Sequence, residues 1–261
     1  MDAIVLAGGR TKPEDPMYAY IGDKPKSLTP MGGRTMVEWV VSALQGAEGV
    51  DDVVVVGLTE ALLPAGGLNF DRPVTFLPDQ NNVVKNVFTS VEHLQQVKPA
   101  QDTYLLVSAD IPLIKPEMVD YFIDACRPYS GVLYYAVVTD AVMEKRFPGS
   151  KRSYVRFTEA NVAGGDIYVF KSALLQKNEE FWNAFVDARK NALRLARTLG
   201  FSFLIKLLLR RLSLAELERT GLRIFGEPIK VVQVRYAELG MDADKPHQID
   251  LVRAELEHSG A

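Results

Sequence analysis

The segment Met1–Arg10, MDAIVLAGGR, decides the fold of this chain. A short apolar run, which ends in Leu6 and Ala7, leads directly into two adjacent glycines, a pattern typical of a buried strand followed by a tight turn. Glycine has no Cβ atom, so the peptide N–H groups of Gly8 and Gly9 can lie against a phosphate or a base. We expect a ligand at the carboxyl end of this strand, with a plain tight turn as the alternative.

Apolar runs rich in β-branched residues recur along the chain and predict further strands. Most of these runs lack the strict alternation of apolar and polar residues that marks a strand with one face in water. They therefore favour strands covered on both faces, as in a mainly parallel sheet. The first strand is expected over Ala3–Leu6, and the others over Val53–Gly57, Val74–Leu77, Tyr104–Ser108, Val132–Val138, Asp166–Phe170 and Ile229–Val234.

Helical patterns separate the predicted strands. Thr35 and Glu38 have the spacing of a capping box, and the apolar residues that follow over 36–44 fall on one helical face. Further helices are expected over Val83–Val97, Pro116–Cys126 and Pro246–Leu256. The repeated alternation of strand and helix predicts an α/β fold of the doubly wound type, with a mainly parallel, mixed sheet and helices on both faces.

The chain is predicted to form a single domain over 1–261, with a helical insertion over 172–225 that lacks strand patterns and is rich in basic and apolar residues. A basic amphipathic segment suits peripheral contact with a membrane, whereas packing over the sheet or a homodimer interface is the alternative. The segments 7–34 and 139–165 are too long to be simple connections, so we expect them to form walls of a site.

Composition restricts the class of protein. With 261 residues, of which 48% are hydrophobic and 24% charged, the chain has the composition of an ordinary globular protein. The formal net charge of -3 gives no general attraction to nucleic acid, and a single cysteine, Cys126, excludes an internal disulfide. Asp2 and the shortness of the first apolar run do not suit a signal peptide, and no run approaches the ~20 apolar residues of a transmembrane helix. A cytoplasmic protein is expected.

Two common nucleotide-binding motifs do not fit the opening turn. A dinucleotide-binding fingerprint needs G-x-G-x-x-G opening into a helix, and a P-loop ends in G-K-[ST]; the turn at Gly8 and Gly9 has neither form. A set of separate segments instead resembles the MobA-like nucleotidyltransferases of the GT-A superfamily. These segments are Leu6–Gly9, Pro25–Leu28, Ser108–Ile114, Gly164–Gly165 and Met241–Pro246.

The resemblance implies a GT-A type, Rossmann-like fold and a Mg2+-dependent reaction. In that reaction a nucleotidyl group passes from a nucleoside triphosphate to a phosphorylated small-molecule or cofactor acceptor, and pyrophosphate is released. One alternative is a GT-A glycosyltransferase that uses a nucleotide sugar, although Pro25–Leu28 argues against it. A degenerate nucleotide-binding or membrane-associated module is the other.

Three aspartates are candidate Mg2+ ligands. Mg2+ prefers oxygen ligands and commonly takes one or two carboxylates from the protein. Asp110 follows a predicted strand, so its carboxylate is expected at the edge of the sheet, and the resemblance implies a second ligand from Asp242 or Asp244. The spacing does not decide between these two. As alternatives, Asp110 is a turn former and Asp244 caps the helix that begins at Pro246.

The resemblance also implies roles for basic residues. Lys26 matches the lysine that reaches the triphosphate in the family, where its charge would stabilise the transition state; a solvated surface lysine is the alternative. The family has a basic residue shortly after the glycines. In this chain either Arg10 or Lys12 takes this position. The inserted stretch 13–23 prevents a choice between them, because it obscures the register of the motif. The candidate catalytic residues are Lys26, Asp110 and Arg10.

The remaining candidates bind the nucleotide and the acceptor. Asn81 and Asn82 precede a predicted helix, where related proteins bind the base or the ribose, and a helix cap is the alternative. The full nucleotide-binding set is Leu6, Ala7, Gly8, Gly9, Lys26, Asn81, Asn82 and Asp110. On the acceptor side, where the family opens its second substrate site, the candidates are Asn161, Gly164, Gly165 and Arg152, with Asp166 beside them.

Overall fold

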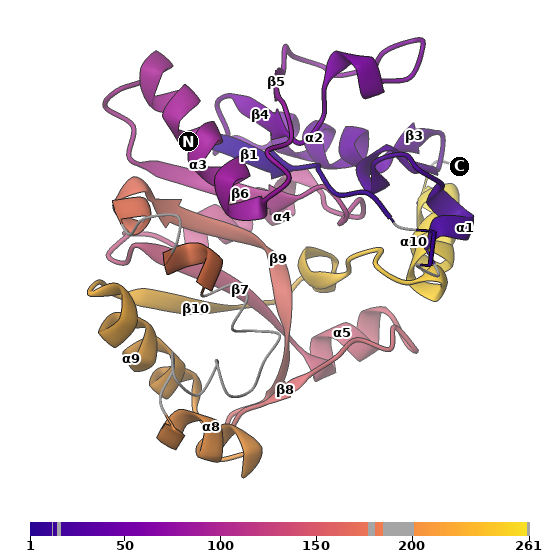
Figure 1. Ribbon diagram of the computed structural model, residues 1–261. Coiled ribbons are helices and arrows are strands. Elements are labelled where there is room, and N and C mark those ends of the chain that lie inside the picture. The colour runs from indigo at the N-terminus through magenta and orange to yellow at the C-terminus, as the bar shows by residue number, and fades with distance from the viewer. Residues whose placement is uncertain (12, 15–16, 177–180, 185–200, 260–261) are drawn as a thin grey trace.

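The computed structural model describes residues 1–11, 13–14, 17–176, 181–184 and 201–259. One large sheet runs through the molecule (Figure 1). Its strands, in spatial order, are β10 (Ile229–Val234), β7 (Leu133–Thr139), β9 (Asn161–Lys171), β6 (Thr103–Ser108), β1 (Asp2–Leu6), β4 (Val53–Val56) and β5 (Thr75–Leu77), with β8 (Val155–Arg156) paired to β9. β1 is parallel to both of its neighbours, and β9 is antiparallel to β6 and β7. The predicted mixed, mainly parallel sheet is confirmed.

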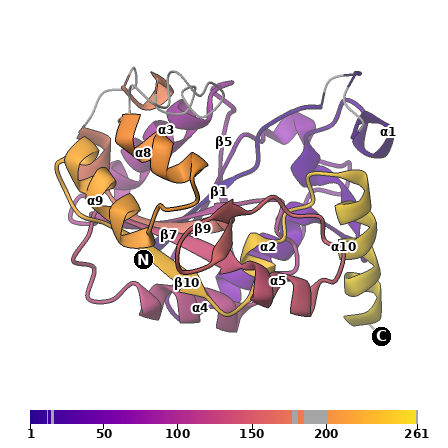
Figure 2. The ribbon, with the colours of Figure 1, turned by 90° about the horizontal axis from the view of Figure 1, so that it is seen from below.

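Helices cover both faces of the sheet, as Figure 2 shows and as the sequence predicted. One face carries α2 (Met36–Gly46), α4 (Pro116–Ala125) and α5 (Asp140–Arg146), and the other carries α3 (Val83–Val97), α8 (Phe201–Leu208) and α9 (Leu214–Phe225). α10 (Pro246–Ser259) lies beside the short α1 (Tyr18–Ile21) at one end of the sheet. A two-stranded ribbon of β2 (Pro30–Met31) and β3 (Arg34–Thr35) leads into α2.

Alternate residues of β1 face the two helix layers. Ala3 and Val5 are buried in the same cluster as the apolar side chains of α2 and α4, whereas Ile4 is buried with Val91 and Leu94 of α3. Because both faces of the strand are covered, its sequence is apolar at successive positions and does not alternate with polar residues.

β9 and α5 differ from their predicted form. β9 begins at Asn161 and not at Asp166, so Gly164 and Gly165, at the end of the segment 139–165, lie inside the strand. α5 lies in the segment 139–165, which was expected to be a loop; Thr139 caps this helix by accepting a hydrogen bond from the Val142 N–H at 3.3 Å.

The segment expected to be a helical insertion is described over 172–176, 181–184 and 201–225. These parts contain the 3-10 turn η3 (Ser172–Gln176), α8 and α9, whereas the basic stretch 189–197 lies outside the described residues. At the end of α8, Leu208 and the next residue, Leu209, are exposed and are followed by the exposed Arg210 and Arg211. An insertion, a membrane contact and a homodimer all stay predictions. Within the described ranges, no helix is both long and apolar enough to cross a membrane.

Candidate active site

The turn after β1 is held by hydrogen bonds from two other segments. The Ala7 N–H donates to the Val56 carbonyl oxygen at 2.8 Å, and the Ser27 hydroxyl donates to the Ala7 carbonyl oxygen at 2.6 Å. Gly9 has a φ of 103°, in the region that favours glycine, and its carbonyl oxygen accepts from the Lys26 N–H at 3.3 Å. The turn is therefore fixed directly to the segment that carries Lys26.

Gly57 lies against this turn and was missed in the sequence. It follows β4 with a φ of 105°, and a Cβ atom at this position would lie 2.2 Å from the Gly8 nitrogen. The backbones at Gly57 and Gly8 are therefore in contact, with no room for a side chain between them. The available signal was a second glycine at the end of a buried strand.

A polar cavity of about 460 Å³ opens beside the turn. It is lined by Gly9, Arg10, Pro25, Gly57, Thr59, Leu62, Pro78, Asp79 and Asn81. These residues come from segments that follow β1, β4 and β5, and ligands of open α/β sheets bind beyond the carboxyl ends of such strands. The structure thus brings Arg10 and Asn81 together with the glycine turn, and we call this space the turn cavity.

Asn81 and Asn82 have different surroundings. Asn81 lines the turn cavity, and its N–H donates to Asp79 Oδ1 at 2.9 Å. Asn82 is the N-cap of α3: its Oδ1 accepts from the Lys85 N–H at 3.1 Å, and its Nδ2 donates to Asn183 at 2.8 Å. Both polar ends of Asn82 are therefore engaged, as in the helix cap that was the alternative interpretation.

Lys26 joins residues from distant parts of the chain. Its ammonium group lies 2.7 Å from Asp110 Oδ2 and also contacts Asp244 Oδ1. The Ser108 hydroxyl donates to the other oxygen of Asp110 at 2.5 Å. The Ala243 N–H donates to the Asp110 carbonyl oxygen at 2.9 Å, so the segment before α10 is attached to the end of β6. The carboxylates of Asp110 and Asp244 consequently meet at the ammonium group of Lys26.

The charges of this cluster fix its protonation. Burial lowers the pKa of Lys26, but Asp110 and Asp244 outweigh burial and raise the pKa above its ordinary value. Burial likewise raises the pKa of Asp110, but the charge of Lys26 and the hydrogen bonds to the carboxylate hold this pKa below its usual range. At neutral pH, Lys26 is protonated and Asp110 is ionised.

Asp242 has a separate partner. Its carboxylate contacts the guanidinium group of Arg152, and both side chains are largely buried. A second guanidinium nitrogen of Arg152 donates to the Gly164 carbonyl oxygen at 3.4 Å, whereas Nε is buried without a hydrogen-bond partner. Burial raises the pKa of Asp242, and the charge of Arg152 opposes that increase. The structure thus brings Arg152 to the acidic cluster, where it pairs with the carboxylate of Asp242.

Asp166 is a fourth carboxylate near this cluster. Burial, followed by the negative charges of Asp110 and Asp242, raises its pKa well above the usual value, although Arg152 opposes the increase. Its Oδ2 atom is buried and has no hydrogen-bond partner. In the sequence, Asp166 was noted only as a neighbour of the acceptor-side glycines. No motif indicated that it lies near Asp110 and Asp242 in the fold.

The acceptor-side glycines are closely packed against protein atoms. A Cβ atom at Gly164 would lie 2.0 Å from the Tyr135 hydroxyl oxygen, and one at Gly165 would lie 2.8 Å from the Ala136 Cβ. These contacts give a packing reason for both glycines, and close approach of an acceptor stays a prediction. The Asn161 amide donates to Asp140 Oδ2 at 2.5 Å and so is engaged with α5.

The chemistry of the residues around Lys26 suits a divalent cation. Asp110 and Asp244 present carboxylate oxygens to one positive charge, and Asp166 adds a buried oxygen that lacks a partner. Within the described residues, no group of three or more His, Cys, Asp or Glu side chains is arranged to hold a metal by itself. Mg2+ does not require one, because it usually takes one or two carboxylates and completes its shell with water and phosphate.

Comparison with known proteins gives the family. The model of the MobA-like NTP transferase domain matches residues 3–199. A solved structure described as a hypothetical transferase from Thermus thermophilus is 35% identical, with a TM-score of 0.80 over 95% of this chain and 98% of that chain. The structure of CMP:2-keto-3-deoxy-manno-octonic acid synthetase complexed with CTP has a TM-score of 0.59 over 99% of this chain and 100% of that chain; at 16% identity it supports the fold alone.

Among curated proteins, the 2-C-methyl-D-erythritol 4-phosphate cytidylyltransferase of Bifidobacterium longum subsp. infantis is 26% identical over 148 residues. The match covers 54% of this chain and 48% of that protein, so the chain spans about half the length of this relative. The family match covers most of the chain and includes the glycine turn, Lys26 and Asp110. The chain therefore belongs to the MobA-like NTP transferase family.

Proposed function

We propose that the protein transfers a nucleoside monophosphate from a nucleoside triphosphate to a phosphorylated small molecule, with release of pyrophosphate and with Mg2+ bound by Asp110 and Asp244. The observation that carries this proposal is the contact of both carboxylates with the Lys26 ammonium group beside the glycine turn. Asp242 is the weaker candidate ligand, because it is buried against Arg152.

The bound Mg2+ would neutralise charge on the phosphate oxygens. Lys26 adds a second positive charge to the same region, and the turn at Gly8 and Gly9 offers backbone approach to the triphosphate. An oxygen of the acceptor phosphate attacks the α-phosphorus and forms a new P–O bond, while the bond from the α-phosphorus to pyrophosphate breaks. Because a phosphate acceptor is already ionised, positioning and charge neutralisation suffice without a general base.

The turn cavity is the proposed site of the base, and cytidine triphosphate is the proposed donor. Arg10, Asp79 and Asn81 supply polar groups around a space of about 460 Å³. A similar curated protein supports the choice of base, since it is described as a cytidylyltransferase. Arg152 is the proposed contact of the acceptor phosphate, because its Nε has no hydrogen-bond partner in the structure.

Pyrophosphate release tests this proposal. The protein is incubated with Mg2+, each of the four common nucleoside triphosphates and a panel of phosphorylated acceptors. We expect release with CTP and a fall of roughly a hundredfold or more for Asp110→Asn and Asp244→Asn. Asp124→Asn is the matched control, because Asp124 is exposed on α4 and pairs with Arg127. Equal rates for all three variants would contradict the proposed metal site, and activity with another triphosphate alone would contradict the choice of base.

A further inference from the structure

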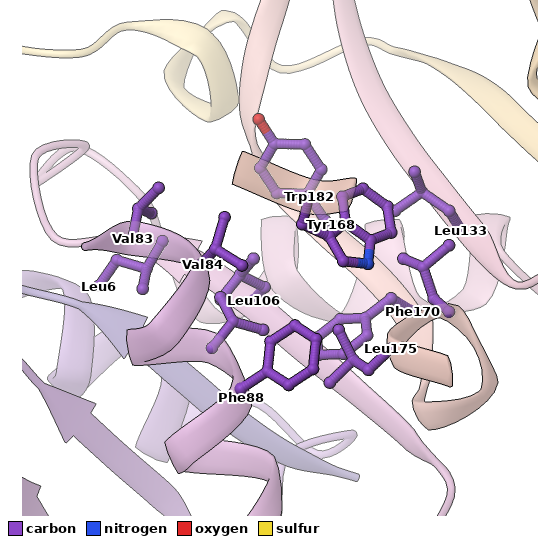
Figure 3. A pocket seen from close by; sticks show the side chains of 12 residues that line it. Leu6, Val83, Val84, Phe88, Leu106, Leu133, Tyr168, Phe170, Leu175 and Trp182 are labelled. Carbon is purple, nitrogen blue, oxygen red and sulfur yellow. The ribbon is translucent and has the colours of Figure 1, made fainter. Parts of the chain in front are cut away.

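A second cavity, distinct from the turn cavity, lies between the sheet and α3 (Figure 3). Its volume is about 220 Å³. It is lined by Leu6, Val83, Val84, Val87, Phe88, Leu106, Leu133, Tyr168, Phe170, Leu174, Leu175 and Trp182. We call it the apolar cavity, because its lining contains no charged side chain.

The apolar cavity begins next to the acidic cluster. Leu6, which lines the cavity, is paired with Ser108 in the sheet, and Ser108 hydrogen bonds to Asp110. Leu106 precedes Ser108 by two residues, and alternate residues of a strand share a face. Leu106 and Ser108 therefore point to the same side of the sheet, so the apolar lining continues directly from the end of β6 that leads into Asp110.

From this end the cavity extends along the strands. Leu106 is paired with Tyr168, and both line the cavity, as does Phe170 at the next position on that face of β9. Two successive positions on one face span about 7 Å. Leu133 of β7, which is paired with Phe170, lines the far part. The lining thus forms an elongated slot that runs along the strands, away from the end of β6 that leads into Asp110.

The side of the slot opposite the sheet is formed by side chains that contact one another. Trp182 stacks on Phe225 of α9, with ring centroids 5.2 Å apart and planes 14° from parallel. Asn183, next to Trp182, accepts the hydrogen bond from Asn82, next to Val83. These contacts connect α3, the 181–184 segment and α9 around the slot. A dry apolar cavity of roughly 150 Å³ accepts benzene in another protein, so this larger space suffices for an aliphatic group.

We propose that the acceptor is amphiphilic: an alkyl or prenyl phosphate whose phosphate reacts beside Asp110 and whose chain enters the apolar cavity. This inference rests on the proposed function for the phosphate end and on the lining of the cavity for the chain. A polar acceptor would leave the slot unused, whereas each methylene moved from water onto its walls favours binding.

Two measurements test the proposal. Pyrophosphate release with CTP is followed for methyl phosphate and for decyl phosphate, and binding of decyl phosphate without nucleotide is followed by displacement of an apolar fluorescent dye. We expect kcat/KM to be at least tenfold higher for decyl phosphate than for methyl phosphate. Inorganic phosphate should not displace the dye.

Val84→Phe fills the cavity from α3, and Val97→Phe is the matched control at the exposed end of the same helix. We expect Val84→Phe to remove the preference for decyl phosphate and the dye displacement, while kcat/KM for methyl phosphate stays within twofold. Leu175→Phe, which fills the slot from η3, replaces it if Val84→Phe does not fold.

The possible outcomes separate the two proposals. If decyl phosphate displaces the dye in the parent protein and not in Val84→Phe, yet no triphosphate releases pyrophosphate, the apolar site stands and the proposed function fails. If methyl and decyl phosphate react equally, or if Val84→Phe and Leu175→Phe leave decyl phosphate binding unchanged, the amphiphilic acceptor is overturned.

Discussion

At the scale of single residues, Lys26 occupies the position between two carboxylates that a metal ion would need. Its ammonium group contacts both Asp110 and Asp244. A cation that binds both carboxylates must therefore compete with Lys26 or move it toward the phosphates of the nucleotide. Lys26 and a metal bound by these two carboxylates would share the same oxygen atoms.

Removal of the Lys26 charge should separate metal binding from activity. In Lys26→Gln, Mg2+ no longer competes with an ammonium group, so we expect tighter Mg2+ binding in the absence of nucleotide, measured by calorimetric titration. We expect nucleotidyl transfer to fall by about 10²-fold to 10³-fold, because a positive charge near the developing phosphate charge is lost. Weaker Mg2+ binding by Lys26→Gln than by the parent would contradict this competition.

Gly57 provides a second test at this scale. Gly57→Ala would place a Cβ atom 2.2 Å from the Gly8 nitrogen and would also adopt an unfavourable φ. Gly67→Ala is the matched control, because Gly67 has a φ of 73° but no atom within 4 Å of the added Cβ. We expect the control to lose about 1–2 kcal/mol of unfolding free energy and Gly57→Ala to lose more, together with nucleotide affinity. Equal losses in denaturant titrations would show that the contact with Gly8 tolerates a methyl group.

At the scale of elements, α2 illustrates how a local motif reaches beyond its helix. The Glu38 carboxylate accepts from the Thr35 N–H at 2.7 Å and from the Asn69 N–H at 2.8 Å. The first bond belongs to the capping box that the sequence predicted, and the second fixes a distant loop to the start of α2. Glu38 therefore stabilises the helix and its connection to the 60–72 region together.

Glu38→Gln should lower the unfolding free energy by about 1–2 kcal/mol at neutral pH. Burial raises the pKa of Glu38, but the backbone hydrogen bonds from Asn69 and Thr35 lower it below the ordinary value. A lowered pKa in the folded state means that the contribution is present above the unfolded pKa of ~4.3 and is lost as the pH falls through the folded pKa. The difference in unfolding free energy between variant and parent, measured by urea titration, should therefore shrink below about pH 4. A constant difference down to pH 3 would contradict this role of the ionised Glu38 carboxylate.

The sequence predicted elements best where their signals were local. The strand before Gly8 and the capping box at Thr35 depend on neighbouring residues, and the structure confirms both elements. The predicted strand began only at Asp166, after Gly164 and Gly165, whereas these glycines lie inside β9, where the Tyr135 hydroxyl of β7 occupies the space of a side chain at position 164. This contact comes from a side chain on another strand, and no local pattern contains it.

At the scale of the whole molecule, the candidate site depends on topology. Lys26 lies 84 residues from Asp110 and 218 residues from Asp244 in the sequence, and the three meet because their segments share the carboxyl edge of the parallel strands. The motifs suggested that Asp110 and one of two later aspartates would converge. They did not distinguish Asp242 from Asp244, because the different partners of the two carboxylates, Arg152 for Asp242 and Lys26 for Asp244, come from distant segments of the chain.

The apolar cavity was beyond prediction for the same reason. Its walls come from β1, α3, β6, β7, β9, η3 and the 181–184 segment. Each contributes apolar residues whose sequence pattern is that of ordinary core residues. Only the assembled fold leaves space between them. The turn cavity was partly predictable, because glycines at strand ends indicate close approach of a ligand, whereas Thr59, Leu62 and Pro78 in its lining had no distinguishing pattern.

The position of the metal is the most direct test of this account. Crystals grown with CTP and Mn2+, which is expected to substitute for Mg2+, would locate the ion by its anomalous scattering. We expect one peak coordinated by the carboxylates of Asp110 and Asp244, with the Lys26 ammonium group displaced toward the triphosphate. A peak that contacts neither aspartate, or a bound triphosphate with Lys26 still held between both carboxylates, would contradict it.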